Sequence, residues 1–399
     1  MQMNNLRNFF DKIKPTFSEG GKLSWLGSTF EGFESFAFSP NTVTKSGSHV
    51  RDGVDLKRTM ITVVIALMPA LLFGMWNIGY QTSLHAENWP YELGTAASWW
   101  YCLLFGFVRM LPMIAVSYIV GLGIEFTFAQ IRHHDIYEGF LVTGIIIPMI
   151  VPVTTPLWQL ALAVAFAVII GKEVFGGTGM NFLNPALVAR AFLFFSYPTH
   201  MSGDQVWIAA KMNPFSTDAL TGATTMGELS TGINPSASAL DMIIGTVPGC
   251  TCETSVIAIA LGAILLLVSG IASWRIMLSV FIGGGLMGGL FNIIGANAYM
   301  QLPFYYHFIM GGFAFGAVFM ATDPVTSAQT NCGKWVYGLL IGAFAVLLRV
   351  LNPAYPEGMM LSILLMNCFA PLIDHCVVSR NIKMRQRRAK LNQGKEVQA

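Results

Sequence analysis

The amino-acid sequence predicts an all-α integral membrane protein with about ten transmembrane helices. Of its 399 residues, 54% are hydrophobic and 11% are charged, whereas soluble domains carry about 25% charged residues. Apolar runs of about 20 residues, the length that crosses a bilayer, recur along the chain. The formal net charge of +2 gives no reason to expect a nucleic acid as a partner.

Ten apolar runs are expected to form these helices. In chain order they cover residues 59–77, 98–125, 139–152, 157–172, 183–196, 254–272, 274–296, 303–321, 335–350 and 359–378. The third, fourth, fifth and ninth runs are short for a full span. The motifs "PVTTP", "GGTG" and "NPAYPEG" bound or interrupt them. Broken helices of this kind place polar backbone at membrane depth in transporters and cofactor sites.

The runs divide the chain into three parts. Residues 1–58 form an N-terminal segment without the apolar core of a cleavable signal peptide, so the first membrane helix is expected to direct insertion. Residues 59–378 form the bundle, and residues 379–399 form a basic tail. The six cysteines lack metal-site spacing, since Cys250 and Cys252 make a C-x-C pair, and are expected to be free buried thiols.

Basic residues predict the orientation of the bundle. With the N-terminus inside, the inner loops carry Arg132, Lys172, Arg275 and Lys334, and the outer loops carry a single basic residue, Lys211. This asymmetry follows the positive-inside rule. Both termini are therefore expected in the cytoplasm, and the long loop 197–253 on the outer face.

The long loop separates five runs from five, which suggests an inverted repeat of two five-helix halves. Each half carries a double glycine followed by an X-Pro pair, in "GGTGMNFLNPALVAR" (176–190) and "GGFAFGAVFMATDPVTS" (311–327). The Gly-to-Pro spacings differ between the two segments, so two unrelated broken helices remain the alternative.

The outer loop contains the polar segment "DALTGATTMGELS" (218–230). No histidine or lysine lies close to Thr224 in sequence to activate its hydroxyl, so modification by another enzyme fits better than catalysis, and we expect no catalytic residue. Gly222 and Ala223 leave that hydroxyl sterically open. Asp218 is placed to hold the turn or to orient a metal ion on an incoming diphosphate. We expect this segment to be exposed and outside the bundle.

The segment "DALTGAT", with Asp218, Thr221, Gly222, Ala223 and Thr224, resembles the flavinylation motif D-G-x-[ST]-[GS]-A-T, with Ala219 where glycine is usual. In proteins that carry the motif, a flavin transferase cleaves FAD and links FMN through its phosphate to the last threonine. Four further segments are similar to the NqrB/RnfD family, whose NqrB members belong to Na⁺-translocating NADH:quinone oxidoreductases (Na⁺-NQR). They are "YEGFLVTGIIIPMIVPVTTPLWQ" (137–159), "GKEVFGGTGMNFLNPALVARAFLFFSYP" (171–198), "MATDPVTS" (320–327) and "PLIDHCVVSRNIK" (371–383).

The resemblance implies two flavins. One is a covalent FMN, attached as a phosphoester at Thr224. The other is a non-covalent riboflavin, for which Asn181 and Asn184 offer amide groups and Arg190 is a candidate because it is an intramembrane charge. Helix packing through small residues and an ordinary capped helix start are the alternative for this segment.

The resemblance also implies a quinone and a sodium ion. Glu138, Gly139 and Gly144 are the quinone candidates, with small-residue helix packing as the alternative. Asp374, in the "PLID" segment, is the Na⁺ candidate, with a helix-end charge as the alternative.

A protein of this kind is expected to pass electrons from FMN through riboflavin to quinone, coupled to Na⁺ translocation. It would sit in a bacterial inner membrane, in contact with lipid, as part of a six-subunit complex. The partner subunits would oxidise NADH and hold iron–sulfur clusters. Two alternatives remain: the RnfD protein of an Rnf ferredoxin:NAD oxidoreductase complex, which generally lacks a long N-terminal segment, and a urea-type solute channel, whose broken-helix fold is similar.

Overall fold

The computed structural model describes residues 12–17, 30, 44, 46–48, 56–85, 89–92, 94–132, 139–203, 206–208, 223–232, 235–352 and 358–396. Every regular element within these ranges is a helix. Six of the helical segments are long and apolar enough to cross a membrane, and three shorter apolar helices of 10–17 residues accompany them. The prediction of an all-helical, multi-pass membrane protein is confirmed at this level.

The first half of the described chain contains two long helices followed by shorter ones. In order these are α3 (Leu56–His85), α4 (Ala96–Arg132), α5 (Phe140–Met149), α6 (Leu157–Gly171), the 3₁₀ turn η2 (Glu173–Phe175), α7 (Pro185–Ser196) and α8 (Pro198–Met201). Helix α3 packs against α4, and α6 packs against both α4 and α7.

The second half begins with two short helices and ends with a very long one. In order these are α9 (Thr225–Ser230), α10 (Ala239–Ile244), α11 (Val256–Val268), α12 (Trp274–Ile294), α13 (Ala298–Gln301), α14 (Tyr306–Ile309), α15 (Phe313–Phe315), the π-helical η4 (Gly316–Met320), α16 (Asn331–Leu351) and α17 (Gly358–Glu396). Helix α16 packs between α12 and α17.

Glycine allows helices α12 and α16 to approach each other backbone to backbone. A Cβ added at Gly342 would lie 2.6 Å from the backbone nitrogen of Gly284. Small residues at such crossings are the usual means of helix association in a membrane.

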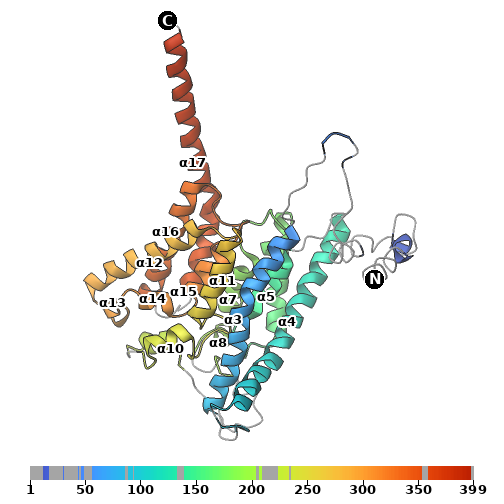
Figure 1. The fold of residues 1–399 in the computed structure, drawn as a ribbon, viewed down its shortest axis with the longest axis vertical. Helices are drawn as coiled ribbons and strands as arrows, with labels where there is room; N and C mark the ends of the chain where they lie inside the picture. Colours follow the sequence, from blue (N-terminus) through green and yellow to red (C-terminus); the bar gives the residue numbers. More distant parts are fainter. Residues whose placement is uncertain are drawn as a thin grey trace.

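Helix α17 corrects the predicted boundary at residue 379. The basic tail does not begin a separate segment, because α17 continues from the apolar run to Glu396 and projects beyond the other helices (Figure 1). Arginine, lysine, glutamine and alanine are good helix formers, so the helix outlasts its apolar stretch. Helix α4 likewise runs seven residues past the predicted end at 125.

The predicted helix 303–321 is also corrected. The structure divides it into α14, α15 and η4, with a break at Gly311, whose φ is +61°. That conformation favours glycine. The break interrupts the helix at residues 310–312, where Met310 is buried, Gly312 is partly buried and Gly311 is exposed.

Two irregular segments, 150–156 and 246–255, meet inside the bundle. The backbone N–H of Cys252 donates to the Met149 carbonyl at 3.2 Å, and Cys250 Sγ donates to the Ile150 carbonyl at 3.4 Å. Cys250 and Cys252 are buried together with Cys102, whereas Cys332, Cys368 and Cys376 are exposed. The prediction of buried thiols therefore holds for three of the six.

The bundle has two distinguishable ends. The start of α3 and the projecting part of α17 lie at one end of the molecule, and α8 and α10 lie at the other (Figure 1). Arg132 is the last residue of α4, and its Nη1 donates to the Glu173 carbonyl at 2.8 Å. We call this end, which carries Arg132, Lys172, Arg275 and Lys334, the basic end, and the opposite end, which carries α8, α9 and α10, the loop end.

Candidate functional site

A cavity of about 840 Å³, open solvent at its mouth included, lies at the basic end. We call it the basic-end cavity. Segments from both halves of the chain line it, and its polar lining includes Thr59, Thr143, Thr178, Asn181, Asn184 and Asp323.

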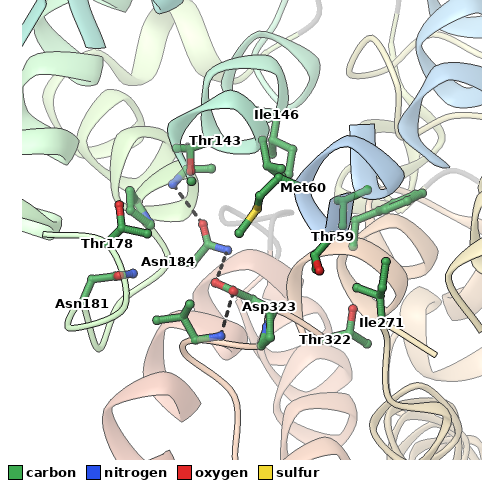
Figure 2. A pocket seen from close by; sticks show the side chains of 18 of the residues that line it. Thr59, Met60, Thr143, Ile146, Thr178, Asn181, Asn184, Ile271, Thr322 and Asp323 are labelled. Carbon is green, nitrogen blue, oxygen red and sulfur yellow. Dashed lines mark hydrogen bonds between the residues drawn. The ribbon is translucent and has the colours of Figure 1, made fainter. Parts of the chain in front are cut away.

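Asn184 and Asp323 meet across this cavity (Figure 2). Asn184 caps α7, because its Oδ1 accepts the Ala186 N–H at 3.0 Å, which confirms the predicted capped helix start. Its Nδ2 donates to Asp323 Oδ2 at 3.2 Å. The two X-Pro pairs noted in the sequence, Asn184-Pro185 and Asp323-Pro324, are thus joined by a hydrogen bond. Each comes from one half of the chain.

Asn181 lies in a glycine-rich turn beside Asn184. Its Oδ1 accepts the Gly179 N–H at 3.3 Å, and its Nδ2 donates to the Leu183 carbonyl at 2.9 Å. Gly177 and Gly179 both have φ of +92°, a conformation that favours glycine. The turn is therefore held by its own hydrogen bonds while Thr178 and Asn181 border the cavity.

The quinone candidates separate in the structure. Gly139 lines the basic-end cavity, and a Cβ there would lie 2.6 Å from Thr178 Cγ2. Gly144 packs against α4, since a Cβ there would lie 2.8 Å from a ring carbon of Tyr118 and its carbonyl accepts from Ser117 Oγ at 2.8 Å. Glu138 lies outside the described residues.

Lys172 also lines the basic-end cavity and forms a buried ion pair with Glu125. Both side chains are at most 5% exposed. The sequence assigned Lys172 to a loop and Glu125 to a helix end, and so missed the pair. Because α4 continues past residue 125, the carboxylate is enclosed and needs the cation beside it.

A second cavity, of about 720 Å³ with open solvent included, lies at the loop end. We call it the loop-end cavity. Its lining contains Thr224 and Thr225 and the polar or charged side chains of Arg190, Cys250, Glu253, Thr254 and Arg349, with Gly311 and Gly312 on one wall.

Thr224 is half-buried at this cavity and forms the N-cap of α9, with its Oγ1 accepting the Gly227 N–H at 3.0 Å. Thr225 and Met226 are buried, and Tyr299 donates its hydroxyl to the Met226 carbonyl at 2.7 Å. The prediction that this segment is exposed and outside the bundle is wrong from Thr224 onward, because α9 docks its apolar side onto the bundle. Ala223 is exposed.

The other members of the flavinylation motif, Asp218, Thr221 and Gly222, lie outside the described residues. Their predicted roles therefore stay predictions.

Arg190 lies apart from Asn181 and Asn184, the other two residues predicted for riboflavin. Its guanidinium pairs with Glu253 and donates to Cys250 Sγ at 3.3 Å. It lines the loop-end cavity, whereas Asn181 and Asn184 line the basic-end cavity. Arg190 lies six residues after Asn184, which corresponds to about 9 Å along a helix. The two residues therefore border different cavities although they belong to the same segment.

Asp374 lies at the basic end, and its carboxylate accepts hydrogen bonds from the two residues that precede α16. Its Oδ2 accepts the Gln329 N–H at 2.7 Å, and its Oδ1 accepts the Thr330 N–H at 3.0 Å and the Thr330 hydroxyl at 2.5 Å. The sequence indicated the carboxylate, but not these partners about 45 residues away.

Long apolar helices, broken helices and two cavities with a few polar groups in their linings define a multi-pass membrane protein. Residues 43–383 match the model of the NQR2, RnfD, RnfE family, and the chain belongs to that family.

Curated relatives agree with this assignment. The chain is 48% identical to a protein of Ectopseudomonas mendocina, 47% to one of Stutzerimonas stutzeri and 46% to one of Azotobacter vinelandii. Each match covers 95% of this chain and 98% of the relative, and each relative is named as the same subunit of a Na(+)-translocating NADH-quinone reductase. The chain is therefore a subunit of an oxidoreductase complex of this type.

Proposed function

We propose that the chain is the membrane flavoprotein subunit of a Na⁺-translocating NADH–quinone reductase. It passes electrons from FMN on Thr224 through riboflavin to quinone, coupled to Na⁺ translocation. The observation that carries this proposal is a pair of cavities at opposite ends of the bundle, one beside Thr224 and one beside Asn181 and Asn184. The near full-length similarity to relatives of that name supports it.

Thr224 suits covalent attachment better than its neighbour. Its side chain is half-buried at the cavity, whereas Thr225 is 6% exposed. A phosphoester requires a reachable hydroxyl, and the hydroxyl of Thr224 is engaged only as the acceptor of one cap hydrogen bond in the described structure. A flavin transferase acting at the loop end would make the bond.

The basic-end cavity fits a non-covalent riboflavin. The amides of Asn181 and Asn184 and the hydroxyls of Thr143 and Thr178 supply neutral donors and acceptors for a ring and a ribityl chain. A flavin bound there would accept and release electrons. Asn184 would be held in position by α7 on one side and Asp323 on the other.

Quinone and sodium complete the proposed reaction at the same end. Gly139 is the proposed quinone residue on the wall of the basic-end cavity, where the side chain of Thr178 packs against it. Glu138, which lies outside the described residues, is proposed with it. Asp374, also at the basic end, is the proposed Na⁺ residue. Partner subunits oxidise NADH and complete the six-subunit complex.

The proposed topology has ten crossings in two halves of five, with the shorter helices and the broken 303–321 segment counted as spans. Both termini lie in the cytoplasm and the loop end faces the periplasm of a bacterial inner membrane. The contact between Asn184 and Asp323, which joins corresponding X-Pro pairs of the two halves, favours the inverted repeat.

Mass spectrometry of the peptide spanning residues 212–245, taken from the purified complex, tests this proposal. An FMN adduct on Thr224 is the expected result. A chain with no flavin, produced together with a flavin transferase, would favour a solute channel. An adduct combined with activity on ferredoxin and NAD, and not on quinone, would favour the Rnf-type role that the same family model includes.

A further inference from the structure

We propose that Glu173 relays protons to the quinone that is reduced in the basic-end cavity. It takes them from the water beside Arg132 and passes them on at Thr178. The inference rests on the proposed function, since it requires a quinone beside Gly139. It goes further in giving the protons of the reaction a route and in giving Glu173 a role.

Quinone reduction needs such a route. A quinone that takes two electrons from a reduced flavin becomes a quinol only when its two oxygens also gain two protons. In each transfer, one proton moves from the Glu173 carboxyl group to the Thr178 hydroxyl, whose own proton passes to a quinone oxygen. Water beside Arg132 then returns a proton to the carboxylate. The protons are thus supplied by the solvent at the basic end, and the electrons by the flavin.

The carboxylate of Glu173 is the first reason. Its side chain is 4% exposed. Among the buried carboxylate oxygens that the structure describes, Glu173 Oε2 alone has no hydrogen-bond partner. By contrast, Glu125 contacts Lys172 directly, and Glu253 contacts Arg190 directly. A buried polar atom without a partner is rare in folded proteins and calls for an explanation, and an oxygen in this position is available to accept a proton.

The position of Arg132 is the second reason. Its side chain is 38% exposed, and its Nη1 lies 3.9 Å from Glu173 Oε2. The same Nη1 donates to the Glu173 carbonyl at 2.8 Å, so its hydrogen bond goes to the backbone and not to the carboxylate. Arg132 therefore holds Glu173 at the edge of the bundle, and the water that hydrates its guanidinium lies next to the carboxylate.

The cavity wall is the third reason. A Cβ built at Gly177 would lie 3.8 Å from Glu173 Oε1 and 3.9 Å from Oε2, so the carboxylate faces this glycine. The next residue, Thr178, lines the cavity (Figure 2), and its Cγ2 lies 2.6 Å from a Cβ built at Gly139. Adjacent Cα atoms are about 3.8 Å apart. The carboxylate thus lies one residue behind the lining, next to the residue proposed for quinone.

Glu173→Gln is the main test, because glutamine keeps the shape of the side chain but cannot relay a proton. NADH-driven quinone reduction is measured in the complete complex. We expect kcat to fall about tenfold, less than the roughly 10²–10⁴-fold of a proton donor in direct contact with its substrate. KM for quinone and reduction of the flavins by NADH should stay unchanged. Asp241→Asn, which removes a carboxylate at the loop end, is the control and should keep the kcat of the unmutated complex.

Formate separates a proton relay from a carboxylate that only stabilises the fold. A small weak acid carries protons in place of a missing carboxyl group, so potassium formate should restore most of the kcat of Glu173→Gln and leave the unmutated complex unchanged. Na⁺ is held constant, and potassium chloride at the same concentration is the salt control. An unchanged kcat in Glu173→Gln would overturn the inference. A loss that formate does not restore would also overturn it, and would leave Glu173 as a structural partner of Arg132.

A photoreactive quinone separates failure of this inference from failure of the proposed function. If it labels no residue of the basic-end cavity, as read by mass spectrometry of the labelled peptides, the proposed quinone site fails and the inference with it. If it labels the cavity and Glu173→Gln has a normal kcat, only the inference fails. Should Glu173→Gln not assemble, Thr178→Val decides in its place. The expected result is a lower kcat that formate restores, and a normal kcat would overturn the relay.

Discussion

The two cavities differ in how their polar groups are compensated. At the basic end, Asn181, Asn184 and Asp323 bond to backbone and to one another, so the wall facing the ligand is already satisfied. At the loop end, a buried arginine keeps an unpartnered Nε among the described residues. The two linings therefore differ in chemistry, with hydrogen-bonded amides at the basic end and a buried arginine at the loop end.

Removing the tether is the strongest way to break this comparison. Thr224→Val lacks the hydroxyl that a phosphoester needs, so the covalent FMN should disappear completely while riboflavin at the basic end stays. Because Thr224 also caps α9, the change should cost about 1 kcal/mol of stability. In-gel fluorescence of the denatured protein measures the flavin, and Thr225→Val, which should keep it, is the matched control. A fluorescent band in Thr224→Val would mean that another residue carries the flavin.

Breaking one buried ion pair at a time sharpens the comparison. Glu253→Gln leaves Arg190 buried beside a neutral group, and Glu125→Gln does the same to Lys172. Each should cost about 3–5 kcal/mol, seen as a lower unfolding temperature of the purified complex. The double replacement of Arg190 and Glu253 by methionine should recover much of the loss. A double variant no more stable than Glu253→Gln would contradict the assignment of the cost to an uncompensated charge.

Asn184→Ala tests the basic-end cavity alone. It removes the cap of α7 and the hydrogen bond to Asp323, for a cost of about 1–2 kcal/mol. Non-covalent flavin, extracted and quantified by chromatography, should fall, while the covalent FMN stays on the protein. Asn297→Ala, which removes the cap of α13 at a site distant from the cavity, is the control. Unchanged riboflavin in Asn184→Ala would take Asn184 out of the site.

The smallest effect is expected at Asp374, which is not in the lining of either cavity. Asp374→Asn should raise the Na⁺ concentration for half-maximal quinone reduction and leave both flavins in place. The loss is at most a few kcal/mol because a partly wet carboxylate is screened. The side chain also accepts hydrogen bonds from residues 329 and 330. If Na⁺ dependence is unchanged and only thermal stability falls, Asp374 serves α16 and not the ion.

Local patterns predicted the parts of both sites that depend on neighbouring residues. The threonine motif and the Asn184 cap lie within a few residues of what defines them, and the apolar runs identified the helices. Contacts between distant residues leave no such local pattern. The separation of Arg190 from Asn181 and Asn184 left no local pattern, because its partner, Glu253, lies 63 residues away. Arg349 carries no local signal because its acceptor, the His307 carbonyl, lies 42 residues earlier. The double glycine marked a broken helix at residues 311–312, but the neighbours of Gly311, Met226 and Arg349, come from distant segments and left no local pattern.

The contact between the two irregular segments has a consequence for synthesis of the protein. The carbonyls of Met149 and Ile150 are paired by Cys252 and Cys250, about 100 residues later in the chain. At a translation rate of about 5–20 residues per second, those carbonyls wait roughly 5–20 s for their partners after they are synthesised. Until then they need water or the insertion machinery, because hydrocarbon offers no donor. The first half of the chain therefore cannot satisfy these carbonyls by itself. The ribosome must first synthesise Cys250 and Cys252, and only then can either cavity close.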